Sequence, residues 1–301
     1  MADPLSRLPW RGPGDGRPDL PVPPGKLPLR RDGKLRKQWR YVAAFAEPFH
    51  VCAARVQVGP LGQTFWAIVD RERGEIHENT KLRFPGARGE VFRERRGGGP
   101  APNLGRTNDS GLVDHIATGD VRVRLRVGEG EWAEAICPTP DGAYVWTRKR
   151  CDIPIHCHIR VGDREWKLDA RGVEDESAGY HPRHTVWSWS AGIGTARDGR
   201  SVGWNLVQGV NDPERNSERA IWIDGEPSEP GPVSFQELDA IDFADGARLD
   251  FTREQERRDS RRLPLVSYEY RQPFGTFAGT LPGGIELASG MGVMEFHDAH
   301  W

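Results

Sequence analysis

Hydrophobic and polar residues alternate along most of the chain after residue 40. In the segment 121–127, VRVRLRV, every second residue is aliphatic and the residues between them are arginines. Successive side chains of a strand point to opposite faces, so this pattern predicts a strand with one buried and one solvated face. Gly, Glu and Gly at 128–130 then lead into EWAEAI at 131–136, which predicts a hairpin.

Runs of this kind recur, and Gly, Asp or Pro stands at almost every junction between them. Such spacing is typical of all-β sandwiches and barrels. Only 254–262, EQERRDSRR, looks helical, and because it lacks an apolar face we predict a charged loop there. The predicted fold class is therefore all-β. The predicted strands are 50–58, 64–70, 121–127, 131–136, 153–161, 164–170, 185–192, 202–210, 219–225, 232–238, 247–252, 265–272 and 292–301.

The number of strands predicts two packed antiparallel β-barrel or lipocalin-like halves. A Pro-rich N-terminal arm, residues 1–40, precedes an N-terminal half at 41–150 and a C-terminal half at 151–301. We expect the boundary between the halves near 148–152. The Gly- and Arg-rich segment 85–103 is predicted to be a loop.

Composition limits the partners of the protein. The 42 Lys and Arg residues nearly balance the 44 Asp and Glu residues, so the basic excess typical of nucleic-acid-binding proteins is missing. The longest uncharged stretch near the start, 56–69, is too short to span a membrane. Four scattered cysteines and the lack of a secretory signal pattern predict a cytoplasmic protein with reduced thiols. The sequence does not indicate the oligomeric state.

Eleven tryptophans form the strongest compositional signal. Trp187 and Trp189 are two residues apart, so they share one face of a strand, and aromatic residues on neighbouring strands would extend them into a wall. This wall would line a cavity in the C-terminal half, although packing in a core is the commoner role of buried aromatic residues. The predicted ligand-binding residues are Trp187, Trp189, Trp204, Asn205, Trp222, Tyr268, Tyr270 and Phe274.

Cys151, His156, Cys157 and His158 look like a metal cluster in the sequence. On an extended strand, however, His156 and His158 share a face while Cys157 points to the other. The Cys-x₂₋₄-Cys pairs of structural zinc sites are also missing. The chain has no nucleophile elbow, phosphate loop or dinucleotide fingerprint either. We therefore expect no metal and no cofactor.

The segment 173–192 is dense in ionisable residues directly before an aromatic strand. Asp175, Glu176 and His184 would lie at the rim of a barrel, where acid-base groups beside an apolar cavity can transfer protons. A solvated rim without a chemical role is an equal alternative.

The C-terminal strand 292–301, GVMEFHDAHW, places Met294 and Phe296 on one face and Glu295 and His297 on the other. The first face suits packing, and the second would face either the inside of a barrel or the seam between the barrels. The carboxylate would raise the pKa of the imidazole beside it. We predict that Glu295 and His297 form a buried pair that anchors the strand or contacts the ligand, with the structural role favoured.

Three segments, 175–192, 202–226 and 272–301, resemble an uncharacterised bacterial family, mainly actinobacterial, that is known as a domain of unknown function. Its members end in a similar Gly-Val-Met-Glu-x-His motif, and the resemblance is specific from about Gly172 to Trp301. It implies no catalytic residue. The two-barrel pattern is more remotely similar to the double-lipocalin group of carotenoid hydratases, tocopherol cyclases and Diels–Alder-type proteins. That likeness implies acid-base chemistry on an apolar ligand inside an aromatic-lined barrel.

These observations favour a lipocalin-like protein that binds an apolar small molecule of isoprenoid, lipid or polyketide type. It would act without a cofactor as a hydratase, isomerase or cyclase, using carboxylate and His groups. A non-catalytic lipid carrier with the same cavity is one alternative. A small carbohydrate-binding protein is another, because tryptophan platforms and paired carboxylates also suit sugars.

Overall fold

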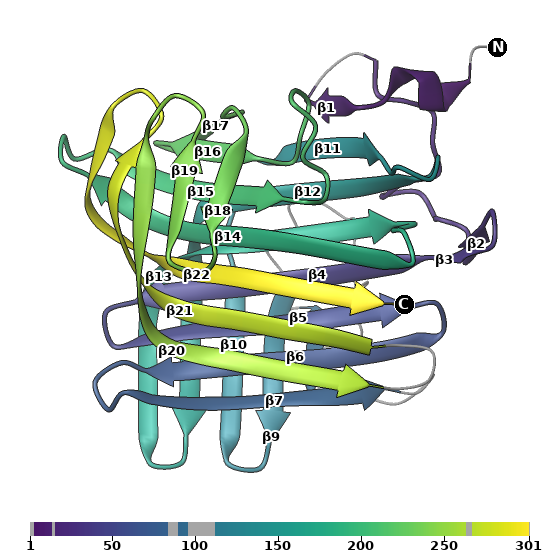
Figure 1. Cartoon of the computed structure of the whole chain (residues 1–301). Helices are drawn as coiled ribbons and strands as arrows, with labels where there is room; N and C mark the ends of the chain where they lie inside the picture. Colours follow the sequence, from purple (N-terminus) through teal and green to yellow (C-terminus); the bar gives the residue numbers. More distant parts are fainter. Residues whose placement is uncertain (1–2, 14–15, 84–89, 96–111, 263–266, 301) are drawn as a thin grey trace.

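The computed structural model describes residues 3–13, 16–83, 90–95, 112–262 and 267–300 (Figure 1). Within these ranges the helical segment is a 3₁₀ turn, η1 (Pro4–Arg7), and the other regular elements are strands. The prediction of an all-β fold built from antiparallel, barrel-like sheets is confirmed. None of the helical segments described is long and apolar enough to cross a membrane.

The first sheet has eleven strands. Nine of them follow the order β7-β6-β5-β4-β13-β12-β10-β9-β8, while β11 pairs with β12 and β1 pairs with β11. Its strands are β1 (Trp10–Gly12), β4 (Lys37–Ala46), β5 (Phe49–Val58), β6 (Leu61–Asp70), β7 (Glu75–Arg83), β8 (Val91–Arg95), β9 (Leu112–Thr118), β10 (Val121–Val127), β11 (Ala133–Pro138), β12 (Tyr144–Val161) and β13 (Arg164–Gly179). A separate two-stranded pair consists of β2 (Arg30–Arg31) and β3 (Lys34–Leu35).

The second sheet has nine strands in the order β17-β16-β15-β14-β22-β21-β20-β19-β18. In Figure 1 its long green and yellow strands run beside the purple and blue strands β4 to β7 of the first sheet. The strands are β14 (His184–Ala196), β15 (Ser201–Gln208), β16 (Ala220–Ile223), β17 (Glu226–Ser228), β18 (Val233–Gln236), β19 (Ala240–Phe243), β20 (Arg248–Arg262), β21 (Ser267–Leu281) and β22 (Ile285–His300).

The long hairpin of β12 and β13 carries the middle of the first sheet. The expected boundary at 148–152 lies inside β12, where the pairing with β13 shifts register between Cys151 and Ile153. Asp152 there has a φ of 61°, a left-handed conformation typical of a bulge residue. The chain passes from the first sheet to the second between Gly179 and His184.

Three of the four apolar clusters among the described residues follow from the alternation of side chains along the long strands. One lies within the curled first sheet, around residues such as Leu125 and Ile155, and one within the second, around Leu206 and Leu249. The third fills the seam between the sheets and includes Phe65 from β6. Trp39 and Tyr41 face this seam from β4, and Trp189 faces it from β14.

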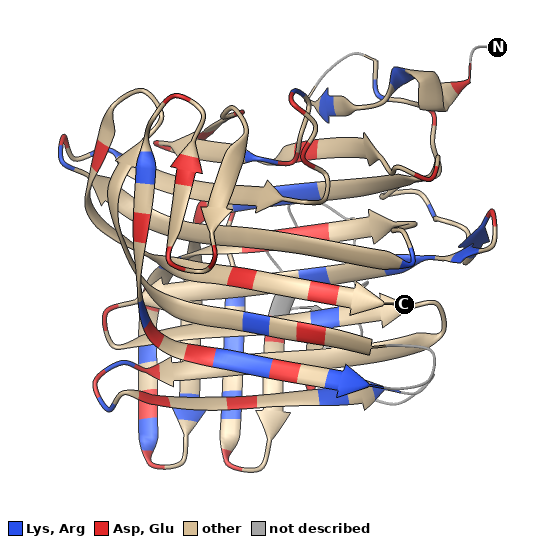
Figure 2. Ribbon diagram, in the orientation of Figure 1, with Lys and Arg blue, Asp and Glu red and all other residues tan. Residues whose placement is uncertain are grey.

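Two sequence-based assignments are wrong. The segment 254–262 is part of β20, because its charged side chains alternate across a strand that pairs along its length with β21. Figure 2 shows the resulting acidic and basic bands along β20. The predicted loop 85–103 contains β8, which pairs with β9, and 84–89 and 96–111 lie outside the described residues.

The proline-rich segment before β4 packs onto the first sheet. Val22 and Leu27 are buried against Tyr144 and Tyr180, and β1 extends the sheet at β11. Its role is therefore that of a strap over this edge of the first sheet.

Candidate functional site

A cavity of about 200 Å³ lies in the seam between the two sheets. A cavity of roughly 150 Å³ already admits a benzene-sized molecule. Strands β4 to β7 supply most of the wall from the first sheet, and β14, β20, β21 and β22 supply the wall from the second. The apolar part of the lining comprises Ala54, Val56, Val58, Leu61, Phe65, Leu82, Val207 and Val210.

Glu295 is the central polar residue of the cavity. Its side chain accepts hydrogen bonds from Trp187 Nε1 at 2.9 Å, from the Tyr270 hydroxyl at 2.7 Å and from Gln272 Nε2 at 3.1 Å. Glu295 is only 8% exposed, and burial raises its pKa to about 6 against the opposing effect of these donors. A carboxyl group with this pKa can both donate and accept a proton near neutral pH.

Aromatic rings surround Glu295 on β22. The ring of His297 lies 4.2 Å from that of Trp187 and 5.2 Å from that of Tyr270, measured between centroids. Trp39 from β4 stacks on Trp187 at 6.3 Å with an angle of 6° between the planes. Aromatic residues from both sheets therefore enclose the same space.

His297 faces the cavity from the same side of β22 as Glu295, while Met294 belongs to the core of the second sheet. Burial lowers the pKa of His297 to about 3, and the positive charge of Arg257 adds to the decrease. The expectation that Glu295 raises this pKa is therefore wrong, because desolvation of the imidazolium is the larger effect. His181, which also lines the cavity, has a pKa lowered by burial to about 3.

A second polar group lies where β12 and β13 meet the cavity. Lys149 Nζ lies 2.5 Å from Asp175 Oδ1 and 3.5 Å from Glu218 Oε1, and all three residues are buried. Burial favours the neutral amine, but the two carboxylates outweigh it and raise the pKa of Lys149. The lysine therefore carries its charge inside the cavity wall.

Arg257 from β20 forms the third polar part of the wall. Its guanidinium lies 4.2 Å from the ring centroid of Phe65 and 4.8 Å from that of Tyr270. Its Nε lies 3.4 Å from Glu78 Oε2, and its Nη2 donates to Thr80 Oγ1 at 2.5 Å. This arginine joins β20 to β6 and β7 across the seam.

The structure brings only some of the predicted site residues together. The cavity is lined by Asp175, Trp187, Trp189, Tyr268, Tyr270, Glu295 and His297. The predicted residues outside the lining are Glu176, His184, Trp204, Asn205, Trp222 and Phe274.

Strand alternation explains most of these exceptions. Glu176 points into the first sheet, where it pairs with Arg148 at 2.7 Å. Trp204 points into the second sheet and covers Gly192, where an added Cβ would clash with the indole. Asn205 supports the cavity from behind by accepting a hydrogen bond from Trp189 Nε1 at 2.8 Å.

The other two aromatic residues pack in the seam core away from the cavity. Trp222 donates its N–H to the Glu131 carbonyl at 2.9 Å. Phe274 lies against His50, with ring centroids 6.2 Å apart.

The predicted site omitted the wall contributed by the first sheet. Trp39 and Tyr41 alternate with Gln38 and Arg40, so the sequence does contain a signal for a shared face on this strand. Nothing in that pattern indicates that the face meets Trp187 from a strand almost 150 residues later. Arg257 was missed because its segment was assigned to a loop.

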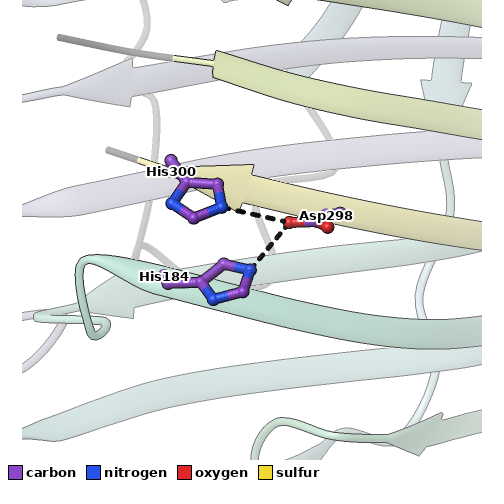
Figure 3. A group of neighbouring side chains, drawn as sticks. All are labelled: His184, Asp298 and His300. Atoms are coloured by element: carbon purple, nitrogen blue, oxygen red, sulfur yellow. Dashed lines mark hydrogen bonds and ion pairs between the residues drawn. The ribbon is translucent and has the colours of Figure 1, made fainter.

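His184, Asp298 and His300 form a separate group on the other face of β14 and β22 (Figure 3). Their ligand atoms lie within 4.8 Å of one another, with His184 Nε2 2.9 Å and His300 Nε2 3.8 Å from Asp298 Oδ1. Two imidazoles and a carboxylate are donors that divalent transition metals accept. Cys151, His156 and His158 have separate partners, namely the Trp204 carbonyl, Asp169 and Glu165.

Residues 118–301 match a protein family described as Domain of unknown function (DUF2804). The chain belongs to this family. The resemblance to a domain of unknown function is thus confirmed, while the bacterial distribution and the shared C-terminal motif stay predictions. A comparison with curated proteins finds no match.

Solved structures are similar to this DUF2804 chain at low sequence identity. Kievitone hydratase from Nectria haematococca is 12% identical, with a TM-score of 0.50, over 86% of this chain and 88% of that chain. A protein named AttH from Nitrosomonas europaea is 15% identical, with a TM-score of 0.45, over 92% and 98%. CghA, solved with Sch210972, is 10% identical, with a TM-score of 0.43, over 87% of each chain.

Proposed function

We propose that the protein binds an apolar small molecule of isoprenoid, lipid or polyketide type in the seam cavity. It acts on this molecule as a cofactor-independent hydratase, isomerase or cyclase, with Glu295 as the acid-base group. One observation carries the proposal: a buried carboxyl group with a pKa of about 6 stands in an aromatic-lined apolar cavity. Perturbed carboxyl groups in such surroundings are typical of catalytic acids.

The chemistry begins with proton transfer from Glu295 to a carbon–carbon double bond. With a pKa of about 6, roughly a tenth of the Glu295 carboxyl groups are protonated at pH 7. The carbocation formed lies among the faces of Trp187 and Tyr270, and aromatic faces attract cations. Water then adds to the cation and returns a proton to the Glu295 carboxylate, or the cation loses a different proton to that carboxylate and the double bond has moved.

The hydrogen bonds to Glu295 fix its position for this transfer. Tyr270 and Trp187 hold its two oxygens separately, and the pKa of Tyr270 is raised well above its usual value, chiefly by burial. Tyr270 therefore stays a donor at neutral pH. The fold shared with kievitone hydratase, a hydratase by name, also favours this class of reaction.

Untargeted mass spectrometry of the purified protein provides the first test, since a tight apolar ligand is expected to co-purify. The recovered molecule is then incubated with wild type, Glu295→Gln and Glu286→Gln. Glu286 lies on the same strand, pairs with Arg197 and is 54% exposed, which makes it a matched control. We expect Glu295→Gln to keep the ligand and lose turnover, and the control to match wild type.

The two alternatives give different results in this experiment. A lipid carrier would release its ligand unchanged from all three proteins. A carbohydrate-binding protein would yield a glycan and no apolar molecule. Either result would overturn the proposed reaction, and the second would also overturn the ligand class.

The four cysteines are separately buried thiols, and this arrangement supports a reducing, cytoplasmic location.

A further inference from the structure

A cluster of arginines occupies the inside of the first sheet, on the face of β4 to β7 opposite the seam cavity. Arg40 on β4 stands directly across from Arg55 on β5, and Arg55 across from Thr64 on β6. Arg83 on β7 stands across from Gly62, and its side chain lies over this glycine. A Cβ added at Gly62 would lie 3.4 Å from the Nε of Arg83. Arg93 on β8 reaches the same space, because β8 contacts β5 and β6 inside the curled sheet.

Acidic residues neutralise only part of this cluster. Arg40 lies 2.6 Å from Asp114 and 2.5 Å from Glu174, and Arg150 also pairs with Glu174 at 2.5 Å. Arg148 pairs with Glu176. Three carboxylates are thus shared among Arg40, Arg93, Arg148 and Arg150, and none of the described carboxylates forms an ion pair with Arg55 or Arg83.

Several buried donors in the cluster also have no hydrogen-bond partner among the described residues. They are the Nε atoms of Arg55, Arg83 and Arg93 and the hydroxyl of Thr64, a residue only 1% exposed. Leaving a buried polar group unpaired costs about 1–3 kcal/mol, and more for a charged group. Burial, together with the charge of Arg83, lowers the pKa of Arg55 to about 10. The electrostatic surroundings therefore oppose another positive charge at this position.

We propose that Arg55, Arg83, Arg93 and Thr64 form a binding site for an oxyanion, either a phosphate or a carboxylate group of a small molecule. Guanidinium groups match the oxygens of such anions with paired N–H donors, and the Thr64 hydroxyl adds one more. An anion there compensates the excess positive charge and satisfies the unpaired donors together.

This site is separate from the proposed reaction. Arg40 and Tyr41 are neighbours on β4, and their side chains point to opposite faces of the sheet, the arginine toward the cluster and the tyrosine toward the cavity. The anion therefore binds whether or not Glu295 catalyses a reaction, and the two proposals fail independently.

The test titrates the full chain with inorganic phosphate and, separately, with succinate, at an ionic strength held constant with sodium chloride. Binding is measured by isothermal titration calorimetry and by the shift in Tm. We expect saturable binding of at least one of the two anions, with a Tm that rises beyond the value in chloride alone. Equal Tm values in phosphate, succinate and chloride, without saturable heat, would overturn the proposal.

Variants locate the binding. Arg55→Gln and Thr64→Val should each weaken the binding of the anion. The affinity should fall by about tenfold or more in Arg55→Gln. Arg197→Gln is the matched control, because Arg197 is 67% exposed and lies in the turn that follows β14, far from the cluster in sequence. If Arg55→Gln does not fold, Thr64→Val still tests whether the anion binds at this site, because Val has nearly the shape of Thr but lacks its hydroxyl donor. Undiminished affinity in every folded variant would show that the anion binds elsewhere and would overturn the proposal.

Discussion

Two glutamates on β22, Glu286 and Glu295, lie in very different environments. Glu286 is exposed and pairs with Arg197. Glu295 is enclosed by aromatic rings, and its partners are neutral donors rather than cations. Desolvation then outweighs the hydrogen bonds, so the pKa rises to about 6. The chemistry proposed for the cavity depends on this difference.

The raised pKa of Glu295 predicts a particular pH dependence of stability. The folded protein binds the proton more tightly than the unfolded chain, so stability is fully present below about pH 4.5 and is lost as pH rises through 6. The loss amounts to about 2 kcal/mol for a shift of this size. Urea unfolding of wild type and Glu295→Gln between pH 4.5 and 7.5 measures it, because the variant lacks this titration. Parallel pH profiles of the two proteins would contradict the prediction.

Tyr270 offers a second prediction at the scale of the residue. Tyr270→Phe removes the 2.7 Å hydrogen bond to Glu295 and leaves the ring in place. Because the hydroxyl lowers the pKa of Glu295, its removal should move the alkaline limb of the pH–rate profile, where activity falls as Glu295 loses its proton, to higher pH. Tyr268→Phe, which loses a bond to Asp259 rather than to Glu295, is the matched control. If this limb fell at the same pH in both variants, the Tyr270 hydroxyl would not control the pKa of Glu295.

At the scale of the element, alternation along β14 and β15 decides which tryptophans meet the cavity. Trp187 lines it and is partly exposed, whereas Trp204 is fully buried in the core of the second sheet. The sequence correctly indicated that Trp187 and Trp189 share a face. It could not place Trp204, because a tryptophan on a strand buried on both faces suits either side equally.

This difference predicts unequal costs of truncation. Trp204→Ala should destabilise the protein by about 3–5 kcal/mol, because it leaves a void in a packed core and an unpaired Ser190 hydroxyl, while Trp187→Ala should cost much less. Chemical denaturation of both variants measures the free energy of unfolding. Equal large losses would indicate that Trp187 serves packing rather than a cavity.

The edge group of β14 and β22 bears on the expected absence of a metal. The rings of His184 and His300 stack with centroids 3.9 Å apart, but His184, Asp298 and His300 are 51%, 39% and 53% exposed, and side chains this exposed are only weakly held in a coordinating geometry. We therefore expect no stoichiometric metal in the purified protein. Elemental analysis checks this, and one zinc per chain that disappears in Asp298→Asn would contradict it.

At the scale of the whole molecule, the sequence predicted barrel-like sheets but not how they meet. Period-two alternation identifies faces, and it placed Glu295 and His297 on one face of β22, the face that lines the cavity. Which strands of the other sheet pack against that face depends on long-range contacts, such as that of Trp39 with Trp187, and no local sequence pattern encodes such contacts. The cavity was therefore expected within the C-terminal half and is instead shared by both sheets. For the same reason the sequence did not predict the arginine cluster. Its members lie on strands between β4 and β8, and they come together only because the first sheet curls.

The seam core predicts that both sheets unfold together. Phe65 and Tyr41 from the first sheet pack against Tyr270 and Trp189 from the second, with ring centroids 5.8 Å and 5.5 Å apart. Unfolding either sheet alone would expose the apolar surface of the other, so scanning calorimetry should record one transition. Phe65→Ala should lower the Tm of that transition without dividing it, because the substitution weakens the contact on which both sheets depend. Two transitions, of which Phe65→Ala shifts only one, would show that the sheets are independent units and that the cavity joins them without coupling their stability.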